Sequence, residues 1–150
     1  SCENCPKTLL EESFTAGLLH DIGMLVLLAE MPKEYQQIFE STTPPTRARE
    51  NELLGCTHAE IGAYLMSIWG IPLSLVQAIA FHHHPMDAGD TCFSALTAVH
   101  AACAILAKSH DTEMDTNYLV SLGLAERESV WRALVAAASP EGSIETHPKT

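Results

Sequence analysis

The chain has 150 residues, 47% of them hydrophobic, and a formal net charge of −11. This size and apolar content suit a single domain with one core. The acidic balance would repel nucleic acid and anionic lipid, so we expect neither a nucleic-acid partner nor a membrane partner. The five cysteines form no evident pairing pattern and no signal peptide opens the chain, which predicts reduced thiols and a cytoplasmic location.

Apolar residues recur at intervals of three and four along the chain, without sustained alternation, and this pattern predicts an all-α fold. The first predicted helix spans about residues 11–29. Because it is apolar on nearly every side, we expect other helices to cover most of its surface. A membrane span is disfavoured here, since His20 and Asp21 lie in the middle, where burial in lipid would be costly.

The remaining predicted helices are separated by recognisable start and stop signals. Thr57 and Glu60 have the spacing of a capping box, Gly55 and Gly123 are placed to end helices, and Pro85 disfavours helical geometry in the residue before it. The expected helices follow Pro32 and then cover about 47–54, 57–68, 72–84, 93–108, 116–121 and 126–138. The long helix over 93–108 is rich in alanine and is predicted to be central. We expect one domain with a core over about 9–138 and polar tails.

The residues that could carry chemistry are a His-Asp pair inside the first apolar segment, a histidine at a helix start and a run of histidines at a helix end: His20, Asp21, His58, His82, His83 and His84. Imidazole and carboxylate are suitable ligands for Zn, Mn, Fe or Ni. Each histidine also has a structural explanation, as a hydrogen-bonded core residue or as a cation favoured near a helix C-terminus. Asp21 is harder to explain in that way, because a buried carboxylate needs a partner.

Helix geometry limits the interpretation of the His20-Asp21 pair. Adjacent residues on a helix point about 100° apart, so His20 and Asp21 can share one site only if it lies between their directions.

Near the start of the chain, Cys2 and Cys5 form a single Cys-x-x-Cys pair. Without a second pair this is weak evidence for zinc or redox chemistry, and a solvated chain end explains it more simply.

Three segments resemble successive motifs of the HDOD family in order and spacing: Phe14-Thr-Ala-Gly-Leu-Leu-His-Asp-Ile-Gly23, His58-Ala-Glu-Ile-Gly-Ala-Tyr-Leu65 and Ala78-Ile-Ala-Phe-His-His-His-Pro85. The resemblance extends over about 9–138. It implies an all-helical bacterial regulatory module, often attached to receiver or other signalling domains and related to the HD and HD-GYP phosphohydrolases. It also implies that the helical subdomain usually found upstream of the His-Asp pair is missing from this chain.

By this resemblance, the residues that could hold metal are His20, Asp21, His58, His82 and His83. Several departures from the active relatives weaken that site. Cys103 stands where they have a final metal-binding Asp, and the upstream metal-binding His has no counterpart before His20. His84 replaces a common Asp or Glu, Met24 replaces a common Lys, and no Gly-Tyr-Pro follows His83. The resemblance therefore implies weak or partial binding of a divalent transition metal (Fe, Mn, Ni or Zn), with Cys103 favouring a softer ion.

Two functions from different classes follow. The leading hypothesis is a non-catalytic signal-transduction module that acts through contacts with other signalling proteins or with an attached receiver or sensor domain. The alternative is a metal-dependent phosphohydrolase acting on a nucleotide or cyclic dinucleotide, in which Asp21 would be the catalytic residue. A nucleotide sensor that binds without cleaving lies between the two. In each case the sequence predicts that the five candidate ligands converge in one cleft.

Overall fold

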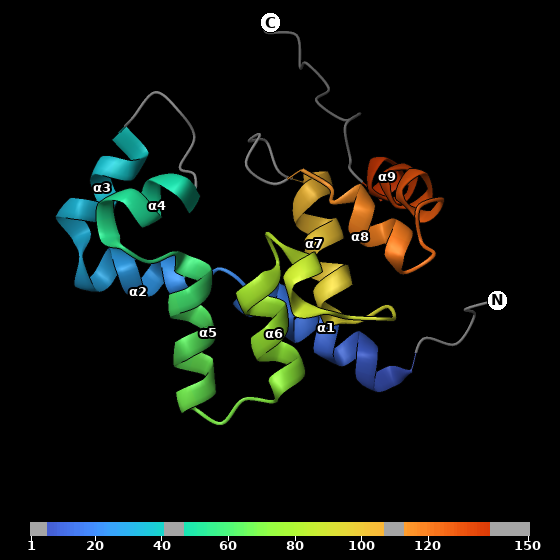
Figure 1. Cartoon of the computed structure of the whole chain (residues 1–150), viewed down its shortest axis with the longest axis horizontal. Coiled ribbons are helices and arrows are strands. Elements are labelled where there is room, and N and C mark those ends of the chain that lie inside the picture. The colour runs from blue at the N-terminus through green and yellow to red at the C-terminus, as the bar shows by residue number, and fades with distance from the viewer. Residues whose placement is uncertain (1–5, 41–46, 107–112, 139–150) are drawn as a thin grey trace, which may run out of the picture.

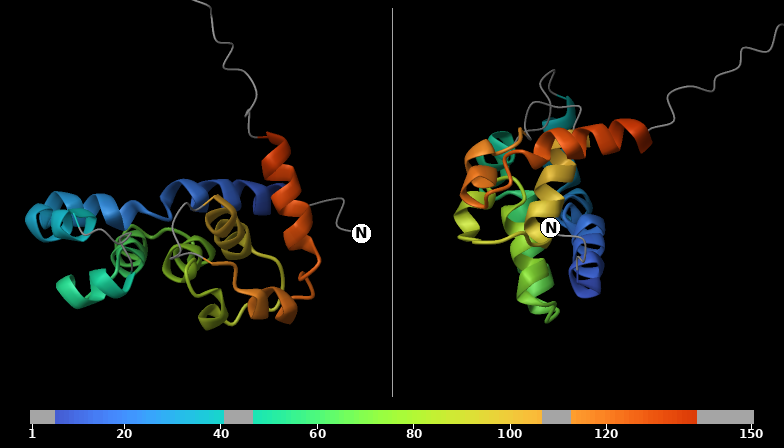
Figure 2. Two further views of the ribbon diagram at one scale, coloured as in Figure 1. Left: turned by 90° about the horizontal axis from the view of Figure 1, so that it is seen from above. Right: turned by 90° about the vertical axis from the view of Figure 1, so that its right-hand side faces the viewer.

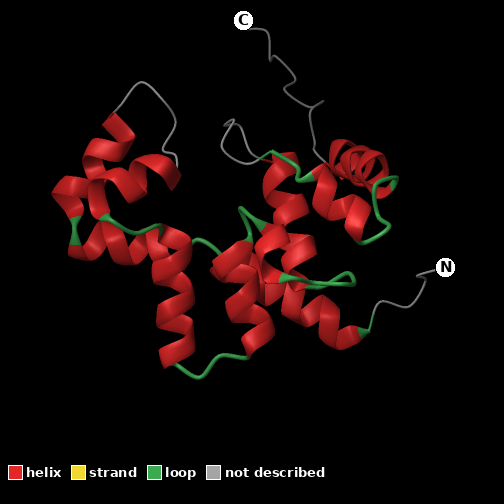
Figure 3. Cartoon of the chain, in the orientation of Figure 1, coloured by secondary structure: helices red, strands yellow, loops and turns green. Residues whose placement is uncertain are grey.

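The computed structural model of the chain describes residues 6–40, 47–106 and 113–138 (Figure 1). Within these ranges every regular element is helical, and Figure 3 draws no strand there. The predicted all-α fold is confirmed. Some of the predictions lie outside the described residues: the Cys2–Cys5 pair, the last residues of the helix predicted over 93–108, and the polar tail after residue 138. The elements are α1 (Lys7–Leu19), α2 (Ile22–Glu30), α3 (Pro32–Glu40), α4 (Arg47–Leu54), α5 (His58–Ile68), α6 (Leu73–Phe81), the 3₁₀ turn η1 (Pro85–Ala88), α7 (Ala95–Leu106), α8 (Thr116–Ser121) and α9 (Arg127–Ala138).

The first predicted helix is in fact two helices. α1 ends at Leu19 and α2 begins at Ile22, and Asp21 between them leaves helical geometry with φ −100° and ψ 13°. The prediction of one helix over 11–29 is therefore wrong. Its apolar pattern runs through the break without a proline, so periodicity alone gives no stop signal. The break removes the fixed 100° angle between His20 and Asp21 that a continuous helix would impose.

The α1–α2 segment lies along one side of the molecule (Figure 2). Leu10, Phe14, Leu18 and Leu25 are 63–69% exposed, so the prediction that other helices cover most of this surface is also wrong. Residues 7–30 are long and apolar enough to cross a membrane by length and composition, and 17% of the most apolar window is buried. This is weak evidence for a span, because core helices of soluble proteins and signal sequences meet the same criterion.

The other start and stop signals act as predicted. The Thr57 side chain accepts a hydrogen bond from the Glu60 N–H, and the Glu60 carboxylate accepts one from the Thr57 N–H, which completes the capping box of α5. Gly55 follows α4 with φ 72°, in the left-handed region that glycine adopts without steric cost. One detail differs at the end of α6, because the helix predicted to reach about residue 84 ends at Phe81, and the 3₁₀ turn η1 begins at Pro85.

The helices form two groups that meet at α5 and α6 (Figure 1). In one group α1 packs on α6 and α7, and in the other α2 packs on α5 and α3. α5 and α6 join the groups through Ala63, Met66 and Ile79. Since α1 belongs to one group and α2 to the other, the turn between them lies at the junction. α7 contacts α1, α6, η1 and α9, so its predicted central place is confirmed. The buried residues of the first group are Ala16, Leu75, Ala78, Ala95, Leu96 and Val99, and those of the second are Leu27, Tyr35 and Ile38.

The backbones of α2 and α5 come very close together at Gly23. A Cβ atom there would overlap the His58 carbonyl oxygen and lie 2.8 Å from the Gly62 nitrogen. Only glycine allows two backbones to come this close. The contact therefore fixes the His20-Asp21 turn, which Ile22 separates from Gly23, against the start of α5.

Candidate metal centre

Asp21 lies at the centre of a group of histidines. Its carboxylate oxygens are 3.1 Å from His20 Nε2, 3.5 Å from His58 Nε2 and 3.8 Å from His82 Nε2. The histidines come from three places in the fold: the α1–α2 turn, the start of α5 and the end of α6. The junction of the two helical groups thus collects side chains that are far apart in the sequence.

Three of the histidines share one arrangement of their ring nitrogens. In each, Nδ1 lies 2.8 Å from an oxygen acceptor: the Gly17 carbonyl for His20, the Glu50 carboxylate for His58 and the Ile79 carbonyl for His82. These acceptors hold a proton on Nδ1 and turn Nε2 toward Asp21. An imidazole whose second nitrogen donates to an oxygen is the usual arrangement of a metal-binding histidine.

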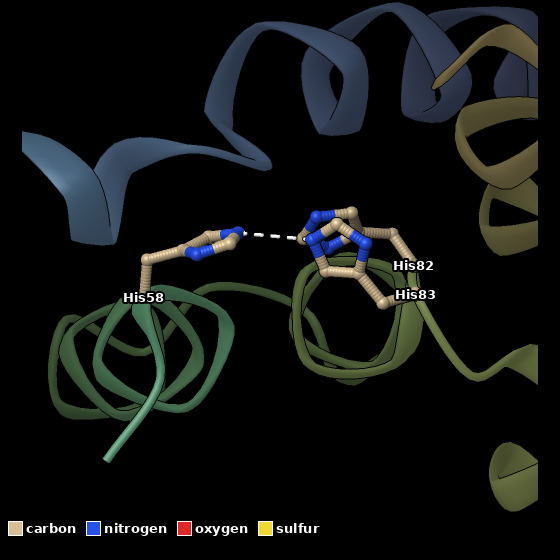
Figure 4. Close-up of side chains that lie close together, drawn as sticks. All are labelled: His58, His82 and His83. Carbon is tan, nitrogen blue, oxygen red and sulfur yellow. Dashed lines mark hydrogen bonds between the residues drawn. The ribbon is translucent and has the colours of Figure 1, made fainter. Parts of the chain in front are cut away.

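His83 completes the cluster from the end of α6. Its Nε2 lies 3.1 Å from His58 Nε2, and Figure 4 shows His58 directed from α5 toward His82 and His83. Two sets of residues can bring one ligand atom each to within 4.8 Å of the others: His58, His82 and His83 form one set, and His20, Asp21 and His82 form the second. His82 belongs to both sets, whereas Cys103 belongs to neither.

The two histidines at the end of α6 are neutral at neutral pH. Burial, together with the adjacent His83 ring, lowers the pKa of His82 to about 3. Burial, together with His58 and Arg47, lowers the pKa of His83 to about 4. A neutral ring keeps the lone pair that a metal needs. The buried Nε2 of His82 has no hydrogen-bond partner within the described protein, which is costly unless a ligand occupies that position.

The exposed side of the cluster carries charge. Burial disfavours the charged form of His20, but hydrogen bonds to Asp21 and Cys103 outweigh it and raise the pKa of His20 to about 10. Burial also disfavours the charged form of Asp21 and so raises its pKa, but the hydrogen bond and the charge of His20 lower this pKa overall. Before an ion can use His20 as a ligand, that histidine must release a proton. Cys103, the residue at the expected Asp position, thus contacts His20 in the structure.

Comparison with known proteins identifies the family. A family model described as "HDOD domain" matches residues 2–85, more than half of the chain. The chain belongs to the HDOD domain family. The match includes the His-Asp pair, His58 and the three consecutive histidines, and it ends at Pro85. The closing helices, which we expected to resemble the family as well, lie beyond the matched residues.

Two curated relatives resemble this HDOD domain over part of their length. An uncharacterized protein of Treponema pallidum (strain Nichols) is 30% identical over 81 residues, which is 52% of this chain and 16% of the relative. Ribonuclease Y of Thermus thermophilus is 32% identical over 112 residues, which is 75% of this chain and 15% of the relative. The chain thus spans about one sixth of each. No solved structure matches it.

The ligand set of this HDOD domain suits a divalent transition metal. It offers imidazole nitrogens and a carboxylate oxygen, and two of the nitrogens, His82 Nε2 and His83 Nδ1, are buried without a hydrogen-bond partner among the described residues. His20, Asp21, His58, His82 and His83 are the residues that would hold the ion. The structure brings together the five residues that the resemblance assigned to the site, and His84 belongs to neither ligand set.

Two residues that support the site were missed by the sequence analysis. Glu50 on α4 is a buried carboxylate that contacts His58. His100 on α7 is fully buried, and its Nδ1–H donates to the His82 carbonyl while its Nε2 accepts from the Asp115 N–H. Glu50 falls within a predicted helix of mainly polar residues, where nothing marks it for burial. His100 falls within the alanine-rich helix predicted over 93–108, where nothing in the local pattern distinguishes it.

Proposed function

We propose that this HDOD domain is a non-catalytic signal-transduction module that acts by contacting another protein through α1 and α2. The observation that supports it most is the apolar surface of these helices. Leu10, Phe14 and Leu18 follow one another at four-residue spacing on α1, and Leu25 and Leu28 add to them on α2. Large apolar side chains gathered on one part of a surface are typical of a protein interaction site.

The charge of the domain indicates which partner would suit this surface. Glu11 and Glu12 lie beside the apolar residues of α1, and Glu30 ends α2, within a chain of net charge −11. A partner with an apolar centre and basic residues around it would complement both features. We infer that the partner is another signalling protein or an attached receiver or sensor domain with such a surface.

Site-specific photo-crosslinking in the source cells tests this contact. A photoreactive phenylalanine would replace Phe14 on α1 in one protein and Tyr64 on α5 in a matched control, since the two side chains are 68% and 69% exposed. We expect one discrete product from position 14 that Leu18→Glu abolishes, and no product from position 64. Equal products from both positions, or a product that Leu18→Glu leaves unchanged, would contradict the proposal.

The composition of the histidine cluster supports the absence of catalysis. Among the described residues that could share an ion, Asp21 is the only carboxylate, and Cys103 contacts His20 where a further Asp would be expected from active relatives. Phosphoryl transfer depends on hard metal ions held in a fixed geometry, for which carboxylates are the preferred ligands. We expect weak or partial binding of Fe, Mn, Ni or Zn.

A metal-dependent phosphohydrolase is the second candidate. Its support is that the two ligand sets share His82, so the cluster has ligands enough for neighbouring ions. Arg47 also lies close enough to His83 to lower its pKa, and a cation there would suit the phosphate of a nucleotide, whether the nucleotide is cleaved or only bound. A bound divalent ion would supply Lewis-acid activation of water, and Asp21 would then be the residue with a catalytic role.

A turnover assay distinguishes the two candidates. Purified wild type, His20→Ala and Asp21→Ala would be given Mn, Fe, Ni or Mg with a cyclic dinucleotide, a nucleoside phosphate and an RNA oligonucleotide, the last because one relative is named a ribonuclease. We expect the same background rate in all three proteins. Turnover by the wild type that both variants abolish would establish the phosphohydrolase instead.

A further inference from the structure

Glu50 is the most deeply buried carboxylate among the described residues, with 2% of its surface exposed. Each of its oxygens accepts hydrogen bonds. Oε1 lies 3.1 Å from the Tyr35 hydroxyl, Oε2 lies 2.9 Å from the His58 backbone nitrogen, and both lie 2.8 Å from His58 Nδ1. A carboxylate removed from water is destabilising unless donors surround it, and these donors meet that requirement.

The contact determines which nitrogen of His58 carries the proton. Glu50 Oε1 accepts from the Tyr35 hydroxyl and Oε2 accepts from the His58 backbone N–H, an arrangement of donors that suits an ionised carboxylate. An ionised carboxylate can only accept hydrogen bonds. His58 Nδ1 must therefore donate, and in the neutral ring the lone pair is left on Nε2, 3.1 Å from His83 Nε2 and 3.5 Å from Asp21 Oδ1.

Glu50 differs from the groups that orient the neighbouring histidines. His20 and His82 donate to the Gly17 and Ile79 carbonyls, each three residues earlier in the same stretch of chain. These acceptors are backbone carbonyls, which helix geometry places three residues before the histidine whatever side chains residues 17 and 79 carry. The acceptor for His58 is a side chain on another helix, and it carries a full negative charge, which makes the hydrogen bond stronger.

We propose that Glu50 is a positioning residue that fixes His58 in the tautomer protonated on Nδ1 and keeps the Nε2 lone pair directed into the histidine cluster. This inference depends on the candidate metal centre only for its consequence, which is that His58 is ready to bind an ion. The tautomer itself is a property of the metal-free chain.

The test compares Glu50→Gln with Tyr35→Phe as a matched control. The glutamine oxygen can still accept from the His58 N–H, but its amide group then faces Nδ1 as a donor and favours the tautomer protonated on Nε2. Tyr35→Phe removes one hydrogen bond from Glu50 and leaves the carboxylate in contact with His58. Circular dichroism first establishes that both variants are folded.

Long-range ¹H–¹⁵N correlation NMR at pH 8, on the metal-free proteins, reads the tautomer directly. We expect a proton on Nδ1 of His58 in the wild type and in Tyr35→Phe, and on Nε2 in Glu50→Gln. A purely structural role for Glu50 would not move the proton between nitrogens. A wild-type ring protonated on Nε2 or on both nitrogens, or a Glu50→Gln ring unchanged from the wild type, would overturn the proposal.

A titration with Co²⁺ measures the consequence separately. We expect Glu50→Gln to bind roughly 10–100-fold more weakly than the wild type, the usual cost of losing a residue that orients a ligand. Tyr35→Phe should stay within about twofold. If the wild type binds no Co²⁺ while the tautomer still changes in Glu50→Gln, the positioning role stands and the metal centre fails. Neither result depends on the turnover or crosslinking assays that test the proposed function.

Discussion

His58 and His82 face each other across the junction of the two helical groups, with their ring centroids 5.5 Å apart, yet different structures hold them. His82 donates to the carbonyl of Ile79 in the last turn of its own helix. His58 donates to Glu50, eight residues earlier and on a separate helix. The comparison teaches that one half of the site depends on local helix geometry and the other on how α4, α5 and α2 pack together.

The largest effect is expected where α2 meets α5. Gly23→Ala should lower the free energy of unfolding by about 4 kcal/mol, because the new methyl group overlaps backbone atoms of His58 and cannot be relieved by a side-chain movement. Urea denaturation followed by circular dichroism measures it. Gly17→Ala on α1 is the control. Its Cβ would have nothing within 4 Å, so this substitution should be neutral or stabilising. Similar losses in both variants would show that the close approach is not required.

Removing the side chain that holds His58 should come next. Glu50→Ala leaves the His58 Nδ1–H, the His58 backbone N–H and the Tyr35 hydroxyl without their acceptor, and we expect a loss of about 3 kcal/mol. Tyr35→Phe, which removes one neutral donor, should cost about 1 kcal/mol. Thermal unfolding of the two variants measures the difference. If Glu50→Ala were no worse than Tyr35→Phe, the carboxylate would not be what holds His58.

His100 on α7 holds the backbone at His82 through a hydrogen bond to the His82 carbonyl. His100→Leu removes the donor to the His82 carbonyl and the acceptor for the Asp115 N–H, and should cost about 2 kcal/mol. Hydrogen exchange gives the sharper measurement, since the Asp115 amide should exchange faster in the variant than in the wild type. Unchanged protection of that amide would mean that His100 does not fix the start of α8 in solution.

The smallest effect is expected on the exposed surface of α1. Leu18→Gln should change the free energy of unfolding by less than about 0.5 kcal/mol, because Leu18 is 69% exposed. Leu27→Ala, at a position on α2 with 3% exposure, should cost about 3 kcal/mol. Chemical denaturation of the pair measures both. A large loss for Leu18→Gln would indicate that this surface is buried in solution, as in a self-associated form.

Local sequence signals were sufficient for most of the helices. The Thr57–Glu60 capping box and the glycines after α4 and α8 mark boundaries because they act within a few residues of the chain. The motif order also singled out His20, Asp21, His58, His82 and His83, since imidazole and carboxylate side chains at these places invite a metal whatever the packing. The sequence by itself therefore determined the all-α class and the residues of the candidate site.

Only the tertiary structure decided how those residues are arranged. The turn at His20 and Asp21 forms where α1 joins one helical group and α2 the other, which no local pattern indicates. The burial of Glu50 depends on donors from α3 and α5, and the need for glycine at position 23 depends on the backbone of another helix. Such interactions join residues distant in the sequence, so periodicity and spacing do not contain them.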